Sequence, residues 1–556
     1  MTQVPNVQTI AKGATPSKLL GGVAAVALLG AFGAPTAALA DTASEIKALK
    51  AELKRLEHKL EDQAKTTHQV KNALNSAKSA PGGNAPPPVF VSFKNGLYVE
   101  TEDKAFDFKI GGRIQVDGGF GGRADTFSAS NVGFRRARLE VEGKAYKNWY
   151  YKFQYDFTGT GVAGIRDAFL AYRTSLLPEQ ITKQPVTFQV GNQYEPFGLE
   201  TLNSSKHIVF IERAMTEALT PARHIGASVG VGDKNWAVKT GLFSTSPQDA
   251  TTAPPTGEAQ YWDASVRAIY APILEEDKLL HVGASFLYHK PNNTTAATDA
   301  NFLRPGNASR DELGILGGGG ALIRVPTAQD LSCAAGAGTL NSTVPAAALA
   351  FAPFFRRSSC LKYSYNYGFE AAAVYGPFSL QGEYVAAQYE RDPTNALLLG
   401  NAGGSSLSYS SYYVFGSVFL TGETRAASYR GYDKDWNTPG TFSDVAIKNP
   451  LSKGGLGAWE FAVRFSELNL NNGGLTGDNY SATLGVGSAL QQALSKTGTI
   501  GGREENLTIG LNWYPDKGVR FQANWTRALT LVAPSDRPYL NGQHPNAFIA
   551  RAQVFW

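Results

Sequence analysis

The sequence predicts an all-β fold, a 16-stranded antiparallel transmembrane β-barrel, preceded by a short N-terminal α-helical coiled coil. Three observations point to this fold. Apolar and charged side chains alternate along one segment after another, the number of such segments is even, and a secretory leader precedes them. Tight connections that alternate with long ones are a further sign of a membrane barrel.

The clearest alternation lies between Phe134 and Phe157, where two predicted strands are joined by a tight turn at Lys147-Asn148. Side chains along a strand point alternately to its two faces, so each of these strands has one apolar and one charged face. One face of the second strand is entirely aromatic: Trp149, Tyr151, Phe153, Tyr155 and Phe157. A soluble β-sandwich shows the same alternation with its apolar face inside, whereas a membrane barrel turns the apolar face to lipid.

Sixteen runs of this kind follow one another to the C-terminus. They start near residues 106, 132, 149, 166, 187, 225, 235, 261, 280, 367, 378, 411, 458, 505, 518 and 546. An even number is typical of bacterial outer-membrane barrels. Four even-numbered connections are tight, at 147–148, 232–234, 376–377 and 516–518, and the longest odd-numbered ones span 290–366 and 467–504. The even-numbered connection 422–457 is long, so it is either a periplasmic excursion or a sign that the strand count is wrong there.

The composition excludes several other classes of protein. After the leader, no stretch offers the roughly 18 uninterrupted apolar residues that a membrane-spanning helix needs. The formal net charge of +5 is too weak to indicate a nucleic-acid partner. A soluble sandwich is the alternative fold, but it would have to bury every aromatic face between sheets, and it would need neither the leader nor the alternating connections.

Three segments precede a barrel domain at 106–556. Residues 1–40 indicate a signal peptide, because an apolar run follows Lys18 and Ala38-Leu39-Ala40 forms a small-residue cleavage site. An uncleaved membrane anchor is the alternative. Residues 41–78 predict a periplasmic coiled coil with an Ile and Leu seam at heptad spacing, and an amphipathic helix packed on its own chain is the alternative. Residues 79–105 form a Pro/Gly-rich linker and a periplasmic lead-in.

With the apolar faces toward lipid, the inward side chains are mixed in charge. The basic ones include Lys109, Arg113, Arg136, Arg138, Lys152, Arg267, Arg464, Arg520 and Arg551. The acidic ones include Asp107, Glu140, Glu142, Asp156, Asp167, Glu370, Glu383 and Glu460. Arginines gathered at a constriction would favour anions, because low-dielectric walls strengthen their field and the guanidinium fork matches phosphate oxygens. The alternative is that these arginines pair across strands and only stabilise the wall.

Several motifs, taken in their order, resemble the phosphate-selective porin O/P family. The stretch Phe134-Arg135-Arg136-Ala137-Arg138-Leu139-Glu140 is similar to the family's FRRA-x-LE strand. Further similar stretches lie at 110–115, 151–156, 191, 197–200, 457–460 and 510–514. Ser204-Ser205-Lys206 with Glu212-Arg213 resembles the family's third outer loop, which folds into the pore. The resemblance covers most of 106–556.

This resemblance implies a homotrimeric outer-membrane channel with an arginine ladder that leads to a narrow zone for phosphate or pyrophosphate. Carried over by motif, the anion-binding residues are Arg113, Arg135, Arg136, Asp167, Lys206 and Arg267. Lys206 would lie on the inserted loop, and Arg267 would belong to a ladder strand. Strict alternation turns Arg135 outward, so its place in the zone requires a β-bulge or a strand that starts at Arg136. Arg304 and Arg310 lie where further ladder arginines are expected.

The leading functional hypothesis is therefore passive diffusion of small anions, phosphate or polyphosphate among them, through an arginine-lined pore. Two alternatives come from other classes: a general diffusion porin with no specific anion site, and an envelope-tethering protein that works through its coiled coil. The sequence contains no catalytic constellation, so we expect neither an enzyme nor a cofactor.

The remaining titratable residues give no further site. His207 and His224 lie near Glu212 and Glu217 in the sequence but lack metal-ligand spacing, so no metal site is expected. Cys333 and Cys360 could form a disulfide in an oxidising compartment, and the sequence leaves this open.

Overall fold

The computed structural model describes residues 88–93, 96–122, 129–159, 164–247, 261–291, 312–313, 322–324, 361–391, 406–472, 499–533 and 538–556, with five isolated positions between 54 and 65. The chain divides into two compact units, Met1–Ser92 with Val99–Ala105, and Phe93–Tyr98 with Phe106–Trp556. Within the described part of the chain, every helix is too short or too polar to cross a membrane.

Most residues of the predicted signal peptide, coiled coil and linker lie outside the described residues, as do Arg304, Arg310 and both cysteines. The five isolated positions are helical and exposed, but the apolar seam of the predicted coiled coil is not among them. The coiled coil therefore stays a prediction. The predicted lead-in contains two strands that pair with each other, β1 (Val89–Phe93) and β2 (Leu97–Thr101).

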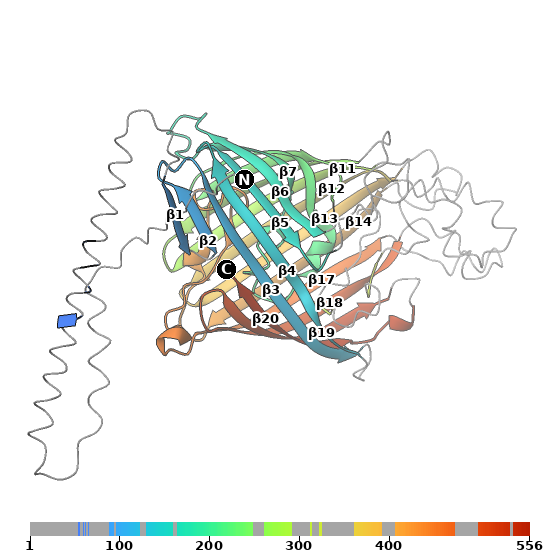
Figure 1. The fold of residues 1–556 in the computed structure, drawn as a ribbon. Coiled ribbons are helices and arrows are strands. Elements are labelled where there is room, and N and C mark those ends of the chain that lie inside the picture. Colours follow the sequence, from blue (N-terminus) through green and yellow to red (C-terminus); the bar gives the residue numbers. More distant parts are fainter. Residues whose placement is uncertain are drawn as a thin grey trace, which may run out of the picture. The chain divides into compact units, whose positions relative to one another are not determined.

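The second unit is a closed antiparallel sheet of sixteen strands (Figure 1). These are β3 (Asp107–Gly122), β4 (Ala129–Ala145), β5 (Trp149–Asp156), β6 (Ile165–Thr174), β7 (Val186–Tyr194), β8 (Arg223–Gly232), β9 (Trp236–Phe243), β10 (Trp262–Leu274), β11 (Lys278–Lys290), β12 (Leu361–Tyr375), β13 (Phe378–Arg391), β14 (Ser406–Phe419), β17 (Ala458–Asn472), β18 (Thr499–Tyr514), β19 (Val519–Val532) and β20 (Asn546–Phe555). Neighbours in sequence pair with each other, and β20 pairs with β3 to close the sheet, with Asn546 opposite Gly122 and Phe555 opposite Arg113. The predicted fold class is confirmed, strand by strand.

The alternation of side chains sorts polar groups to the inside of the barrel and large apolar groups to the outside. In β10, Asp263, Ser265 and Arg267 are buried, whereas Trp262 and Tyr270 are 46% and 49% exposed. Soluble proteins show the reverse distribution, with charged residues outside and apolar residues inside. An apolar outer wall around a polar interior is the arrangement of a barrel that lies in lipid.

The connections differ between the two ends of the barrel. At one end, the short-turn end, the connections 146–148, 233–235, 275–277, 376–377 and 515–518 are tight. The long connection 420–457 also starts at this end, between β14 and β17, and these two strands pair directly. The strand count from the sequence is therefore correct. The connection contains the short elements η8 (Ala426–Ser428), β15 (Tyr429–Arg430), β16 (Thr441–Phe442) and η9 (Leu451–Lys453).

The 420–457 segment folds back into the barrel. The hydroxyl of Tyr432 lies 2.7 Å from Thr187 Oγ1 on β7 and donates to Gly230 O on β8 at 2.8 Å. Arg267 on β10 donates to Pro439 O at 2.6 Å. Thr187, Gly230 and Arg267 all belong to the buried face of the wall, so the segment occupies the interior next to β7, β8 and β10.

A second segment, the 195–222 loop, enters the interior from the opposite end and contains α2 (Leu199–Leu202) and η3 (Met215–Leu219). Phe197 and Met215 are fully buried in its apolar cluster. The two inner segments meet where the Phe442 N–H donates to Asn203 Oδ1 at 3.0 Å and His207 Nδ1 lies 3.0 Å from Asp444 Oδ1. The interior is thus filled from both ends by segments that contact each other.

The fold generates a first prediction, for the variant Tyr432→Phe. We expect it to lower the free energy of unfolding by about 1 to 3 kcal/mol, because buried partners lose the hydroxyl that satisfies them. Urea-induced unfolding of the purified barrel in detergent measures this change. Tyr539→Phe is the matched control, since Tyr539 is 61% exposed, and it should leave stability unchanged. Equal stability of the two variants would contradict the placement of Tyr432.

Candidate functional site

The 195–222 loop is anchored where it leaves and rejoins the wall. The N–H of Glu195 donates to Ala222 O at 3.2 Å, which closes the loop at its base. Gly198 has a φ of 70°, a left-handed conformation that glycine adopts without strain and that turns the chain into α2. The carboxylate of Glu383 on β13 then accepts the N–H groups of Leu199 at 3.0 Å and Glu200 at 2.5 Å. These N–H groups have no partner within the helix, so the carboxylate supplies one.

Beyond α2, the loop crosses the interior through a series of turns and bends, and wall side chains bind its carbonyl groups. Arg520 donates to the carbonyls of Ile208 and Val209 at 2.7 and 2.9 Å, Arg551 to that of Ile211 at 2.6 Å, and Arg464 to that of Glu212 at 3.0 Å. Gln115 donates to Ser205 O at 3.0 Å and Gln553 to Lys206 O at 3.1 Å. Three of the inward arginines predicted from the sequence therefore hold the loop in place.

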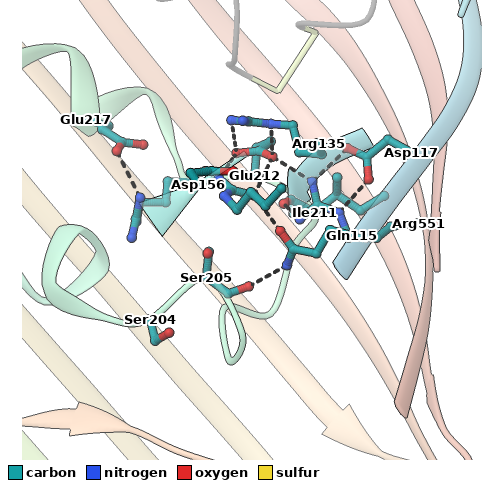
Figure 2. Close-up of polar contacts among 12 residues, drawn as sticks. Gln115, Asp117, Arg135, Asp156, Ser204, Ser205, Ile211, Glu212, Glu217 and Arg551 are labelled. Atoms are coloured by element: carbon teal, nitrogen blue, oxygen red, sulfur yellow. Dashed lines mark hydrogen bonds and ion pairs between the residues drawn. The ribbon is translucent and has the colours of Figure 1, made fainter. Parts of the chain in front are cut away.

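Glu212 of this loop gathers three guanidinium groups (Figure 2). Arg135 Nε lies 2.8 Å from its carboxylate, Arg136 Nη2 3.1 Å and Arg551 Nη2 2.7 Å. Arg135 and Arg136 both reach Glu212 because β4 carries a bulge. Gln115 on β3 lies opposite Arg136, and the next residue, Val116, lies opposite Phe134, so Arg135 is the extra residue. Of the two explanations that the sequence left open for Arg135, the structure shows the β-bulge.

The charges around Glu212 are largely balanced. Burial alone would raise the pKa of Glu212, but the positive charges of Arg135, Arg136 and Arg551 hold it well below its usual value. Arg551 also binds both oxygens of Asp117, at 2.6 and 2.7 Å. The cluster contains three guanidinium groups and two carboxylates, so most of its positive charge is already neutralised.

Next to this cluster, the two inner segments and the wall border an open cavity of about 690 Å³. Its lining includes nine lysine and arginine side chains and six aspartates and glutamates. Three of the residues proposed from the sequence, Arg113, Asp167 and Lys206, line it together. Ten further lining residues, Lys434 and Asp435 among them, come from the 420–457 segment. The excess of basic groups gives the cavity a positive field, which its low-dielectric surroundings strengthen.

Within the described part of the chain, Arg113 is a buried lining residue that binds no carboxylate directly. It is only 3% exposed, and its Nη1 donates to Ser205 Oγ at 2.7 Å. No carboxylate of the described residues forms an ion pair with it, and no acceptor in that part of the chain reaches its Nε. Glu140 and Asp167 lie near enough to stabilise its charge, but neither binds it directly. A buried charge that is incompletely paired is costly, so Arg113 would gain from an anion in the cavity.

Lys206 lies on the same cavity and is part of a charged row on the wall. Its Nζ is 2.5 Å from Glu140, and Lys152 binds Glu142 at 2.9 Å with Glu140 at 3.9 Å. Burial lowers the pKa of Lys206 to about 8, and the charge of Arg113 adds to this effect although Glu140 opposes it. Lys206 therefore changes charge close to physiological pH.

Asp167 is held by an arginine that sequence reasoning missed. Arg223 Nε lies 2.7 Å from Asp167 Oδ1, and the guanidinium carbon is 3.7 Å from the centre of the Tyr194 ring. Arg223 is the first residue of β8 and follows the inner loop directly. The period of two does not single it out, because His224 beside it is buried as well.

Arg267 lies in a different environment from the other predicted site residues. Its guanidinium binds Glu370 at 2.5 and 3.1 Å, and His281 Nε2 also lies 2.9 Å from Glu370. Arg113, Asp167 and Lys206 share the cavity, Arg135 and Arg136 lie at Glu212, and Arg267 holds the 420–457 segment. The six predicted residues thus fall into three groups.

Comparisons with known proteins show which family this chain is similar to. The family model described as phosphate-selective porin O and P matches residues 108–312 and 361–556, well over half of the chain. Porin O of Pseudomonas aeruginosa strain PAO1 is 28% identical over 456 residues, covering 80% of this chain and 87% of that protein. An uncharacterized protein of Caulobacter vibrioides is 27% identical over 556 residues. The match covers 92% of this chain and 93% of that protein. Among solved structures, the outer membrane channel DcaP of Acinetobacter baumannii is 9% identical with a TM-score of 0.38, over 82% of this chain and 99% of that chain.

The site generates a second prediction, for the variant Glu212→Gln. Three guanidinium groups would then lose a shared buried counter-charge, so we expect the free energy of unfolding to fall by about 3 to 5 kcal/mol. Thermal or urea unfolding in detergent measures this loss. Glu217→Gln in the same loop is the matched control, because among the described residues Glu217 pairs only with Arg213, and its side chain is 43% exposed. That pair should contribute no more than about 0.5 kcal/mol. A loss as large for the control as for Glu212→Gln would overturn this assignment.

Proposed function

The chain belongs to the phosphate-selective porin O and P family, and on this premise we propose that it passes phosphate, pyrophosphate and similar oxyanions by diffusion through a constricted pore. As a member of the family it is an outer-membrane porin. The family and the barrel point to a channel rather than an enzyme. We propose further that the channel is a homotrimer, as the resemblance of its motifs implies.

The observation that carries the proposal is the guanidinium of Arg113, which borders the cavity and binds a serine hydroxyl instead of a carboxylate. An oxyanion in the cavity would accept charge-assisted hydrogen bonds from Arg113 and Lys206, each roughly twice as strong as a neutral one. Glu140 limits this gain by sharing Lys206. Such a balance suits a channel, since an ion must bind well enough to enter and weakly enough to leave.

The other residues proposed from the sequence would act by positioning. Arg135 and Arg136 bind Glu212 and so fix the loop that carries Lys206. Asp167 orients Arg223 at the cavity, and Arg267 holds the 420–457 segment. In this proposal only Arg113 and Lys206 contact the ion directly.

A general diffusion porin is the second candidate, and one observation favours it. Most inward arginines bind carboxylates or loop carbonyls, as Arg464, Arg520 and Arg551 do. Arginines that are satisfied in this way would only add a transverse field to the pore. The two candidates differ in whether phosphate competes with chloride.

A third prediction tests the specific site. Phosphate at millimolar concentration should reduce the chloride current of the purified channel in planar bilayers, because weak sites of about −3 to −4 kcal/mol are then partly filled. Arg113→Gln should weaken this block at least about tenfold, which corresponds to the loss of one charge-assisted hydrogen bond of about 1.4 kcal/mol or more. Chloride conductance itself should persist.

Lys434→Gln is the matched control for this measurement. It removes the same charge from the lining of the same cavity, but Lys434 is exposed and therefore screened by salt. It should leave the block nearly unchanged. If phosphate up to tens of millimolar leaves the native chloride current unaltered, the specific site is refuted and the general porin remains.

A fourth prediction concerns pH. The pKa of Lys206 is lowered to about 8, so its charge is present below that pH and is lost as the pH rises through it. Anion preference, measured as the reversal potential in a KCl gradient, should therefore decline as the pH rises through about 8. Lys206→Arg should flatten the decline, because a guanidinium stays protonated throughout. The same decline in Lys206→Arg and in the native channel would show that another group is responsible.

A further inference from the structure

Four buried side chains meet at the barrel end where the 195–222 loop enters, away from the anion cavity. Glu195 follows β7, His224 lies on β8, Asp263 on β10 and His289 on β11. Glu195, Asp263 and His289 have no exposed surface, and His224 is 4% exposed. His224 Nδ1 lies 2.5 Å from Glu195 Oε1 and 4.0 Å from Asp263 Oδ2, and His289 Nδ1 lies 2.5 Å from Asp263 Oδ1.

The two carboxylates of this cluster lack a permanent positive partner in the described part of the chain. Their recorded ion pairs are with histidines alone. Glu195 Oε2 and Asp263 Oδ2 are buried, and no hydrogen-bond donor among the described residues reaches either atom. Two adjacent buried carboxylates are costly unless a cation or protons compensate them.

We propose that Glu195, His224 and Asp263 bind one divalent transition-metal ion, with Zn²⁺ as the best fit, and that His289 orients Asp263 through its Nδ1. One potential ligand atom from each of the three residues lies within 4.8 Å of the others. This spacing suits an ion that takes nitrogen and oxygen ligands at about 2.0–2.2 Å. The histidine nitrogen argues against Ca²⁺ and Mg²⁺, which prefer all-oxygen sites.

The ligands' positions assign a structural role to this site. Glu195 is the first residue of the 195–222 loop, and its N–H already bridges to Ala222 at the loop's other end. A metal ion here would tie the base of the loop to β8 and β10. His224 Nδ1 contacts Glu195 directly in the structure, and an ion bound between them would replace this contact. This inference is independent of the proposed anion selectivity.

The test uses the full-length protein purified from outer membranes and stripped with a chelator. Titration with Zn²⁺, followed by calorimetry, should give one ion per chain, and Co²⁺ in its place should give the visible absorption of nitrogen and oxygen coordination. His224→Gln and Asp263→Asn should abolish the stoichiometric binding. His289→Gln should weaken it about tenfold to hundredfold, as expected for a residue that only orients a ligand.

His281→Gln is the matched control, because His281 is also fully buried and contacts a carboxylate, Glu370, at 2.9 Å, but it lies outside the cluster. It should keep native zinc affinity. Anomalous diffraction at the zinc edge on native crystals locates the ion even if a variant does not fold. No stoichiometric zinc in the native protein, equal loss in His281→Gln, or an anomalous peak away from Glu195, His224 and Asp263 would each overturn the proposal.

Discussion

The interior of this barrel depends on one requirement. The carbonyl groups of the 195–222 loop must find hydrogen-bond donors where no neighbouring strand supplies them. Backbone polar groups that are buried without partners are costly, so their satisfaction decides where the loop can run. Arg520 and Arg551 provide much of this satisfaction by donating to Ile208, Val209 and Ile211. Once the loop is fixed by these donors, Ser205 and Lys206 are fixed as well, and with them the surroundings of Arg113.

The same requirement sorts the arginines by function. The arginines that bind loop carbonyls or Glu212 have hydrogen-bond partners and stabilise the fold. Arg113 borders the cavity, and in the described structure its Nε has no hydrogen-bond acceptor. Buried charge that is incompletely paired reduces stability, and proteins keep such groups where a ligand can use them. The affinity of the proposed anion site thus depends on positive charge, such as that of Arg113, which is not used to hold the loop in place.

The site is formed by two inner segments that enter from opposite ends of the barrel. The 195–222 loop supplies Lys206 and Ser205, and the 420–457 segment supplies further lining residues from the short-turn end. Their contacts at Asn203 with Phe442 and at His207 with Asp444 couple the two. A change in either segment therefore alters the cavity, and the proposed metal site would hold one of them at its base.

The sequence by itself determined the barrel and its strands. At Arg135, where the alternation of β4 conflicts with the motif, it left a β-bulge or a strand that starts at Arg136 open, and the structure shows the bulge. These features are local, because the period of two and the turn residues are written in neighbouring positions. It also placed Arg113, Arg136 and Lys206 on the inside of the barrel. It did not determine which partner each would have. Glu212 and Arg551 are 339 residues apart in sequence, and the Glu195, His224 and Asp263 cluster forms only because strand ends become neighbours. Only the tertiary structure decided these pairings. They depend on the closure of the barrel and on the path of the two inner segments, and residue spacing along the chain encodes neither the closure nor the path.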